Sequence, residues 1–151
     1  MKKWKTFGIL LIAVVIGFDQ WLKSWVVQNI PLGATKFANP LIDLTYLQNR
    51  GAAWSMLSGR RWFLIGLTVV IMAVLIYFLV KAHNAWLIMG LSLAISGALG
   101  NLIDRIRLGY VVDMFQLECF RFPIFNVADV ALFCGVCCLL IYLIRSDQQE
   151  E

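Results

Sequence analysis

Charged residues and histidine are scarce in this 151-residue chain. Only 15% of the residues are Asp, Glu, Lys or Arg, one is His, and 61% are hydrophobic. So low a fraction of charged residues excludes an ordinary soluble domain, in which about a quarter of the residues are charged. With one histidine we expect no zinc site, no other metal and no cofactor. No repeated pattern of basic and aromatic residues suggests nucleic acid as a partner.

Cysteines give no basis for predicting a disulfide. Three of the four, Cys134, Cys137 and Cys138, recur at helical spacing within one apolar run, where thiols behave as small hydrophobic groups. Cys119 stands alone in a predicted outer loop. The chain also lacks low-complexity segments and convincing internal repeats.

Long hydrophobic runs are what the chain does contain. A helix needs roughly 20 apolar residues to cross the hydrocarbon core of a bilayer, and it satisfies its own backbone hydrogen bonds there. Windows of this kind lie at residues 6–27, 62–80, 85–103 and 124–144. We therefore predict an all-α membrane protein, a four-transmembrane-helix bundle with a small periplasmic β-sheet or flap, forming a single integral membrane domain over residues 1–151.

The first run resembles a signal peptide, because Lys2, Lys3 and Lys5 precede an apolar stretch. No A-x-A-like cleavage site follows, and apolar character resumes at Trp21 after Asp19, which favours an uncleaved first span. The basic N-terminus predicts that both termini are cytoplasmic. In that orientation more basic residues lie outside than inside, so we expect some outer arginines to have a function of their own.

The connection at residues 28–61, called the flap below, is too long to be a simple connector. Within it Ile42, Leu44 and Tyr46 alternate with polar residues as a strand does. A turn is predicted from Asn49 to Gly51. The flap is therefore predicted to form a small sheet resting on the outer surface of the membrane.

Three of the predicted spans carry polar side chains in their outer half. At about 1.5 Å per residue, Asp19 lies roughly 12 Å below the outer end of the first span, and Asp129 about 7 to 8 Å into the fourth. Asp104 lies at the rim of the third span. Asn101 and Asn126 precede two of these aspartates by three residues, a spacing that places each pair on one helix face. Charge in a bilayer is costly, so such groups usually pair or function.

Several of these residues also have a purely structural explanation. Asp19 stands four residues before Lys23 and can pair with it. Asp104 can pair with an arginine from another segment. Asn101 and Asn126 can form hydrogen bonds between helices. These alternatives stay open from the sequence alone.

Asp113 is predicted to lie in the short outer loop between the third and fourth spans. Neither Asp113 nor Asp129 has a basic residue at helical spacing on its own segment. Two nearby carboxylates cannot both ionise easily and so share a proton. One then takes a proton from water while the other hydrogen-bonds the scissile carbonyl, which is the chemistry of an aspartic peptidase. A coupled pair titrates as a unit, so the holder of the proton stays open, although a position near a helix N-terminus favours the ionised form of Asp129.

Two other classes of function use such carboxylates. A small ion- or proton-coupled membrane transporter is the main alternative, but transporters usually need more spans or a repeat. A non-enzymatic assembly subunit, whose aspartates pair with a partner's basic residues, is the third possibility.

Four segments of the chain have an order and spacing that are highly specific. They read DQWLKSW at 19–25, QNRGAAWSML at 48–57, SGALGNLIDRIRLGYVVDMF at 96–115 and FNVADV at 125–130. In these segments the chain resembles the bacterial lipoprotein signal peptidase family, also called signal peptidase II or prolipoprotein signal peptidase. Ser96 stands where many members have a glycine and Met114 where phenylalanine is common, and neither departure affects a carboxylate.

The resemblance implies an aspartic endopeptidase of the bacterial inner membrane, with its active site toward the periplasm. It would act among membrane lipids on diacylglyceryl-prolipoproteins, cleaving before the lipidated cysteine, and globomycin-type inhibitors would bind it. Asp113 and Asp129 would be the catalytic residues. The resemblance places substrate binding at Asn49, Gly97, Asn101, Arg105 and Asn126. It places supporting roles at Asp19, Lys23, Gly51, Asp104 and Ala128.

Overall fold

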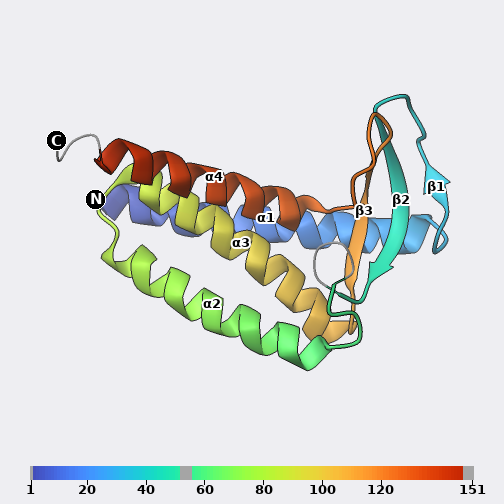
Figure 1. Ribbon diagram of the computed structural model, residues 1–151, viewed down its shortest axis with the longest axis horizontal. Helices are drawn as coiled ribbons and strands as arrows, with labels where there is room; N and C mark the ends of the chain where they lie inside the picture. Colours follow the sequence, from blue (N-terminus) through green and yellow to red (C-terminus); the bar gives the residue numbers. More distant parts are fainter. Residues whose placement is uncertain (1, 52–55, 148–151) are drawn as a thin grey trace.

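The chain folds into four helices and one three-stranded antiparallel sheet in a computed structural model that describes residues 2–51 and 56–147. The helices are α1 (Lys2–Asn29), α2 (Arg61–Lys81), α3 (Ala85–Arg107) and α4 (Val127–Asp147). The strands are β1 (Thr35–Lys36), β2 (Ile42–Asn49) and β3 (Val111–Leu117). The sheet stands across one end of the helices, and α1 begins and α4 ends at the opposite end (Figure 1).

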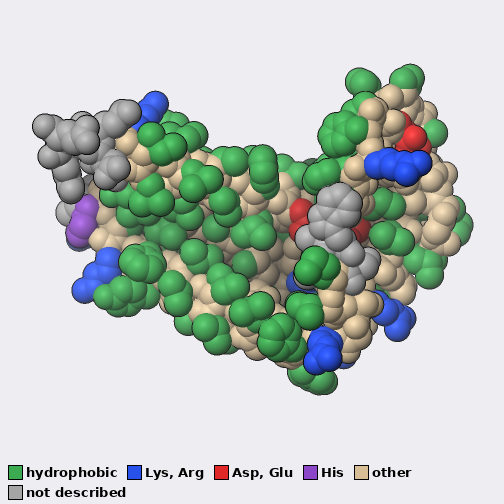
Figure 2. Space-filling model, viewed as in Figure 1, with side chains coloured by type: hydrophobic (Ala, Val, Ile, Leu, Met, Phe, Trp, Pro, Cys, Tyr) green, Lys and Arg blue, Asp and Glu red, His purple; other side chains and the backbone are tan. Residues whose placement is uncertain are grey.

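All four helices are long and apolar enough to cross a membrane, which confirms the four predicted spans. Hydrophobic side chains cover much of the helical surface seen in Figure 2, and Lys and Arg side chains lie toward its two ends. On α2, for example, Trp62 is 75% exposed and Val70 63%. Exposed apolar surface on this scale marks an interaction surface, and here it fits contact with lipid.

Two predicted span boundaries differ from the helices. The third span was predicted to end at residue 103, whereas α3 continues to Arg107 and so contains Asp104. The fourth was predicted to begin at residue 124, whereas α4 begins at Val127. The reason is that Phe125 pairs with β3 through its backbone and cannot join the helix. Asp129 is therefore the third residue of α4, closer to the outer end than the sequence predicted.

Helix α3 lies at the centre of the bundle and packs against the other three helices. Glycines allow its backbone to touch that of α4. A Cβ atom on Gly97 would lie 2.2 Å from the carbonyl oxygen of Ala128, and one on Gly135 would lie 2.5 Å from the backbone nitrogen of Ala94. Small residues commonly allow such close approach between membrane helices. The contact fixes the start of α4 against the outer half of α3.

The sheet has the order β1-β2-β3, with β2 in the centre. The predicted strand in the flap is confirmed as β2. Strand β3 is a correction, because the sequence placed Asp113 in a loop although Val111 and Val112 are typical strand formers. Leu47 of β2 lies opposite Asp113 of β3. A small apolar core fixes the sheet to the end of α1, and its members are Val26, Ile30, Tyr46, Val112 and Met114.

Arg61 joins the outer ends of α2 and α3. Its Nε donates a hydrogen bond of 2.7 Å to the carbonyl oxygen of Arg105, and its Nη2 donates one of 2.7 Å to that of Ile106. The last carbonyl groups of a helix lack partners within the helix, and a cation near them is stabilising. One side chain from α2 thus caps α3 beside Arg105.

Candidate functional site

The two candidate carboxylates meet where the sheet joins α4. The backbone nitrogen of Phe125 donates to the oxygen of Phe115 at 3.1 Å, and that of Phe115 donates back to Phe125 at 2.8 Å. Asp113 is two residues before this contact and Asp129 is four residues after it. The short antiparallel contact therefore brings β3 and the first turn of α4 to one place.

Asn126 and Asp129 cap the start of α4 reciprocally. Oδ1 of Asn126 accepts a hydrogen bond from the backbone nitrogen of Asp129 at 2.9 Å. Oδ2 of Asp129 accepts one from the backbone nitrogen of Asn126 at 3.1 Å. This arrangement satisfies two N–H groups that the helix itself leaves unbonded. The prediction that the two side chains share a helix face is wrong in this respect, since Asn126 precedes the helix.

Three carboxamide side chains link the two carboxylates. Nδ2 of Asn126 donates to Oδ1 of Asp113 at 2.7 Å, and Nδ2 of Asn49 donates to Oδ2 of the same residue at 3.0 Å. Nδ2 of Asn101 donates to Oδ1 of Asp129 at 2.7 Å. The Asn101 oxygen in turn accepts from Nδ2 of Asn126 at 3.0 Å. Each carboxylate thus accepts two N–H groups within one continuous network.

The two carboxylates differ in their surroundings. Asp113 is 1% exposed, and this burial, reinforced by the charge of Asp129, raises the pKa of Asp113 to about 7. The hydrogen bonds from Asn49 and Asn126 and the charge of Lys23 act against this rise. Asp129 is half-buried and lies in the first turn of α4, where the helix dipole stabilises a negative charge. Near neutral pH, Asp113 is therefore a carboxyl group that can hold a proton.

Arg105 lies between the carboxylates and the flap. Its Nη2 donates a hydrogen bond of 2.9 Å to the carbonyl oxygen of Gly51, and its guanidinium interacts electrostatically with both candidate carboxylates. The predicted turn from Asn49 to Gly51 is closed by the Asn49 side chain, which accepts from the backbone nitrogen of Gly51 at 2.9 Å. Arg105 and Asn49 therefore hold the start of this turn beside the carboxylates.

A cavity of about 430 Å³ opens onto this network. Its apolar and weakly polar walls include Thr68 and Ile71 of α2 and Leu132 of α4. Its polar lining consists of Asn49, Asn101, Arg105, Asp113 and Asp129. Five of the predicted site residues thus face one cavity, between helices that lie in the membrane. Pockets of this kind, largely apolar with a few convergent polar groups, are typical of binding sites.

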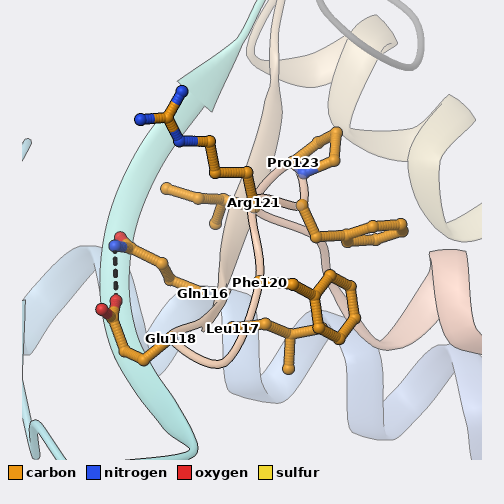
Figure 3. A pocket seen from close by; sticks show the side chains of 8 residues that line it. Gln116, Leu117, Glu118, Phe120, Arg121 and Pro123 are labelled. Carbon is orange, nitrogen blue, oxygen red and sulfur yellow. Dashed lines mark hydrogen bonds between the residues drawn. The ribbon is translucent and has the colours of Figure 1, made fainter.

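A larger cavity, of about 640 Å³, lies over the connection between β3 and α4. Figure 3 shows Gln116, Glu118 and Arg121 pointing to one side of this segment and Leu117 and Phe120 to the other. Gln116 donates to Glu118 at 2.7 Å. Glu118 is the one acidic residue among the described residues that line it, so this cavity lacks a carboxylate pair and is not the candidate site.

A buried ion-pair cluster lies behind the carboxylates. Nζ of Lys23 is 2.9 Å from Oδ2 of Asp19 and 3.1 Å from Oδ2 of Asp104. The pairing of Asp19 with Lys23 is confirmed. The alternative in which Asp104 pairs with an arginine is not what the structure has, because its salt-bridge partner is Lys23 of α1. Within residues 2–51 and 56–147, no three His, Cys, Asp or Glu side chains are grouped to hold a metal ion.

Of the predicted supporting residues, Asp19, Lys23 and Asp104 form this cluster and Ala128 donates to Asp19. Gly51 lies apart from it, in the flap turn beside Arg105. One further residue joins the cluster. Gln20 donates to Oδ1 of Asp104 at 2.9 Å and to the carbonyl oxygen of Gly100 at 3.2 Å. Sequence reasoning gave Gln20 no role, although an amide beside Asp19 in an apolar span was a usable signal. Gly97 and Ala128 meet at the contact of α3 with α4.

A sequence model of the family described as signal peptidase (SPase) II matches residues 11–145. The chain belongs to the signal peptidase II family. The resemblance drawn from the four sequence segments is thereby confirmed, and the chain is a bacterial membrane protein of a peptidase family.

Named relatives match the chain over almost its whole length. It is 50% identical over 145 residues to the lipoprotein signal peptidase of Enterococcus faecalis, covering 94% of this chain and 90% of that protein. It is 49% identical over 149 residues to the lipoprotein signal peptidase of Lactococcus lactis subsp. lactis, covering 97% and 99%. The match therefore includes all four helices and the sheet.

Two solved structures share the fold. One, described as a bacterial membrane enzyme solved by the in meso method at 2.3 Å resolution, gives a TM-score of 0.91 at 33% identity and covers 97% of this chain and 92% of that one. Another, described in the same words at 1.9 Å resolution, gives 0.84 at 36% identity and covers 91% and 92%. The arrangement of sheet and helices in the chain is thus that of known membrane enzymes.

Proposed function

We propose that the chain is an aspartic endopeptidase that removes the signal peptide from diacylglyceryl-modified prolipoproteins by cleaving before the lipidated cysteine. The observation that supports this most is the amide network joining Asp113 to Asp129 at the edge of a cavity between helices. The relatives are named lipoprotein signal peptidases, and a carboxylate pair supplies the chemistry that peptide hydrolysis needs.

In the proposed reaction the carboxylate of Asp129 accepts a proton from a water molecule, whose oxygen attacks the scissile carbonyl carbon. Protonated Asp113 donates its proton to the carbonyl oxygen, giving a neutral tetrahedral intermediate. The carbon–nitrogen bond then breaks as Asp129 passes its proton to the leaving nitrogen. Asp113 recovers its proton from the intermediate's hydroxyl group, which becomes the new carboxyl oxygen. Both aspartates return to their starting states, as catalysis requires.

The position of the cavity suits such a substrate. A signal helix and two acyl chains are soluble in lipid, so the site must be open to the bilayer while water reaches the carboxylates. The cavity walls on the membrane helices include Thr68, Ile71 and Leu132. Asp113 lies on the sheet, at the outer end of these helices. In this proposal Arg105, which lines the cavity, binds a headgroup oxygen or a backbone carbonyl oxygen of the substrate.

The proposed orientation has both termini in the cytoplasm and the sheet in the periplasm. In a variant whose four native cysteines are replaced by alanine, a cysteine introduced at Lys36, which is exposed on β1, should react with a membrane-impermeant maleimide from the periplasmic side. Reaction from the cytoplasmic side alone would reverse the topology.

Cleavage of a purified diacylglyceryl-modified precursor tests the function. Wild-type enzyme should release the signal peptide, should leave the unmodified precursor uncut, and should be inhibited by globomycin. Asp113→Asn and Asp129→Asn should each lose at least about 100-fold in turnover, as expected when an acid or base is removed. The variants must still insert and fold, which size-exclusion chromatography and thermal unfolding in detergent will show.

Glu118→Gln is the matched control, because Glu118 is an exposed acidic residue that directly follows β3, the strand of Asp113, and lies outside the candidate cavity. It should keep wild-type turnover. Near wild-type cleavage by either aspartate variant would refute the assignment of the pair. Equal cleavage of modified and unmodified precursor would refute the proposed substrate.

A further inference from the structure

Lys23 does not contact either proposed catalytic carboxylate, but it bonds to Asn101, which does. Its side chain is 3% exposed and does not line the candidate cavity. It lines a separate cavity of about 160 Å³ together with Gln20 and Asp104. The two cavities share no lining residue, so substrate in the first cannot touch Lys23. Lys23 can therefore affect the reaction only through a neighbouring side chain or through its charge.

That neighbour is Asn101. Nζ of Lys23 donates a hydrogen bond of 3.1 Å to Oδ1 of Asn101. A lysine ammonium carries three donors and no acceptor, so the Asn101 atom that faces it must be the amide oxygen. The amide nitrogen then points the other way, to Oδ1 of Asp129 at 2.7 Å. A flipped Asn101 would set donor against donor at Lys23 and acceptor against acceptor at Asp129.

A second amide bonds to the same Asn101 oxygen. The Asn101 oxygen also accepts from Nδ2 of Asn126 at 3.0 Å, so the nitrogen of Asn126 must point inward. That nitrogen donates to Oδ1 of Asp113 at 2.7 Å, and the Asn126 oxygen is left to accept from the backbone of Asp129. With Lys23 present, both amides have one orientation that satisfies every atom in the network.

We infer that Lys23 is a positioning residue for the proposed peptidase: its buried ammonium holds the oxygen of the Asn101 amide and so aims the N–H group of that amide at the catalytic carboxylate of Asp129. This inference rests on the proposed function. Asn126 keeps its direction without Lys23, because its oxygen accepts from the backbone nitrogen of Asp129. Without the ammonium, the Asn101 oxygen keeps only the donor from Asn126, and an amide held by that one bond would present its N–H group to Asp129 only part of the time.

The charge of Lys23 adds an effect that can be measured separately. The charged groups that face Asp113 are Asp129 from α4, Lys23 from α1 and Arg105 from α3, while β2 presents the neutral Asn49. The Lys23 charge lowers the pKa of Asp113. The proposed reaction needs Asp113 protonated, so activity falls as pH rises through its pKa. Loss of the Lys23 charge should therefore move this alkaline limb to higher pH.

The test compares kcat, KM and the pH profile of wild type and Lys23→Met on diacylglyceryl-modified precursor. We expect kcat per folded molecule to fall about 100-fold, because the proposed base, Asp129, loses its fixed donor from Asn101. KM should stay within about twofold, because Lys23 does not contact the cavity, and the alkaline limb should shift upward. Lys36→Met removes an exposed lysine and should match wild type in all three quantities.

A second variant separates orientation from stability and charge. Lys23→Met leaves Asp19 and Asp104 buried together, and breaking a buried pair on one side is strongly destabilising. The double variant Lys23→Met with Asp19→Asn removes one positive and one negative charge, so the cluster keeps its net charge. It should fold better than the single variant and still lose kcat, with a smaller shift of the alkaline limb.

The outcomes distinguish the inference from the proposed function. If Asp113→Asn and Asp129→Asn are inactive but the folded double variant turns over at the wild-type rate, the Lys23 inference is wrong and the peptidase stands. If the Lys23 variants lose only folded protein, with unchanged kcat and pH profile per folded molecule, Lys23 is structural and the inference is again wrong. If the aspartate variants are active, the proposed function itself fails.

Discussion

Asp19 and Ala128 are 109 positions apart in the chain, and Oδ1 of Asp19 accepts a 3.0 Å hydrogen bond from the backbone nitrogen of Ala128. Ala128 directly precedes Asp129. On the other side of the cluster, Oδ2 of Asp104 accepts from the backbone nitrogen of Val112 at 3.0 Å, the residue before Asp113. Two buried carboxylates thus hold the backbone immediately before each candidate catalytic aspartate.

Replacing Asp19 should affect folding more than chemistry. Asp19→Ala leaves the Ala128 N–H unbonded and leaves Asp104 as the carboxylate that pairs with Lys23. Breaking a buried ion pair in this way costs about 3–5 kcal/mol. We expect a lower yield of folded protein and a lower unfolding temperature in detergent, with turnover per folded molecule reduced much less.

Asp43→Ala is the control for Asp19, because Asp43 lies on β2 and bonds only to Asn39 among the described contacts. It should keep nearly normal yield. A normal yield of inactive Asp19→Ala protein would show that Asp19 serves the chemistry directly, contrary to this prediction.

Adding a single methyl group at Gly97 should separate α3 from α4. The new Cβ atom would lie 2.2 Å from the Ala128 oxygen and 2.7 Å from the Leu132 nitrogen, and neither backbone atom can move alone. Overpacking of this kind costs about 1–3 kcal/mol or more. Gly97→Ala should lower both the unfolding temperature and turnover, since the displaced backbone leads directly into Asp129.

Gly66→Ala is the matched control, because nothing lies within 4 Å of a Cβ atom at Gly66. Alanine favours helix over glycine by about 1 kcal/mol, so this variant of α2 should be as stable as wild type or slightly more so. Equal unfolding temperatures for the two alanine variants would contradict the close contact at Gly97.

The stability of the protein should depend on pH through Asp113. Burial, then the charge of Asp129, raises the pKa of Asp113 from its ordinary 3.8 to about 7 in the folded chain. Because the folded pKa is the higher one, this residue contributes most to stability below about pH 4, and the contribution is lost as pH rises toward 7. Asp113→Asn cannot ionise and should escape that loss.

Thermal unfolding at pH 5 and pH 8 checks this sign. The unfolding temperature of Asp113→Asn minus that of wild type should be larger at pH 8 than at pH 5, by several degrees. Asp43→Asn provides the baseline for an aspartate of the neighbouring strand. A difference that shrinks with rising pH would mean that the folded chain holds Asp113 ionised.

Local patterns in the sequence were enough to predict the helices and part of the cluster. Hydrophobic length located the four spans, alternation located β2, and the spacing of four residues predicted the pairing of Asp19 with Lys23. Each of these features depends on neighbours in sequence. The prediction that the polar groups of three spans gather at one end also follows from their positions along the helices.

Features that depend on distant segments could not be predicted in this way. Strand β3 exists because β2 and Phe125 pair with it, and the same contact delays the start of α4 to Val127. Asp104 meets Lys23 because α1 packs on α3. The orientation of the Asn101 amide follows from a lysine on another helix, which no local pattern encodes.

The division of the polar groups among the helices has a consequence for biosynthesis. Lys23 and its two aspartates belong to α1 and α3, so the buried ammonium meets its carboxylates as soon as these two helices pack together in the bilayer. Asn126 and Asp129 arrive only with α4, which leaves the ribosome after α1 and α3. A growing chain can therefore pair its buried lysine in the membrane while its candidate site still lacks Asn126 and one of its two carboxylates.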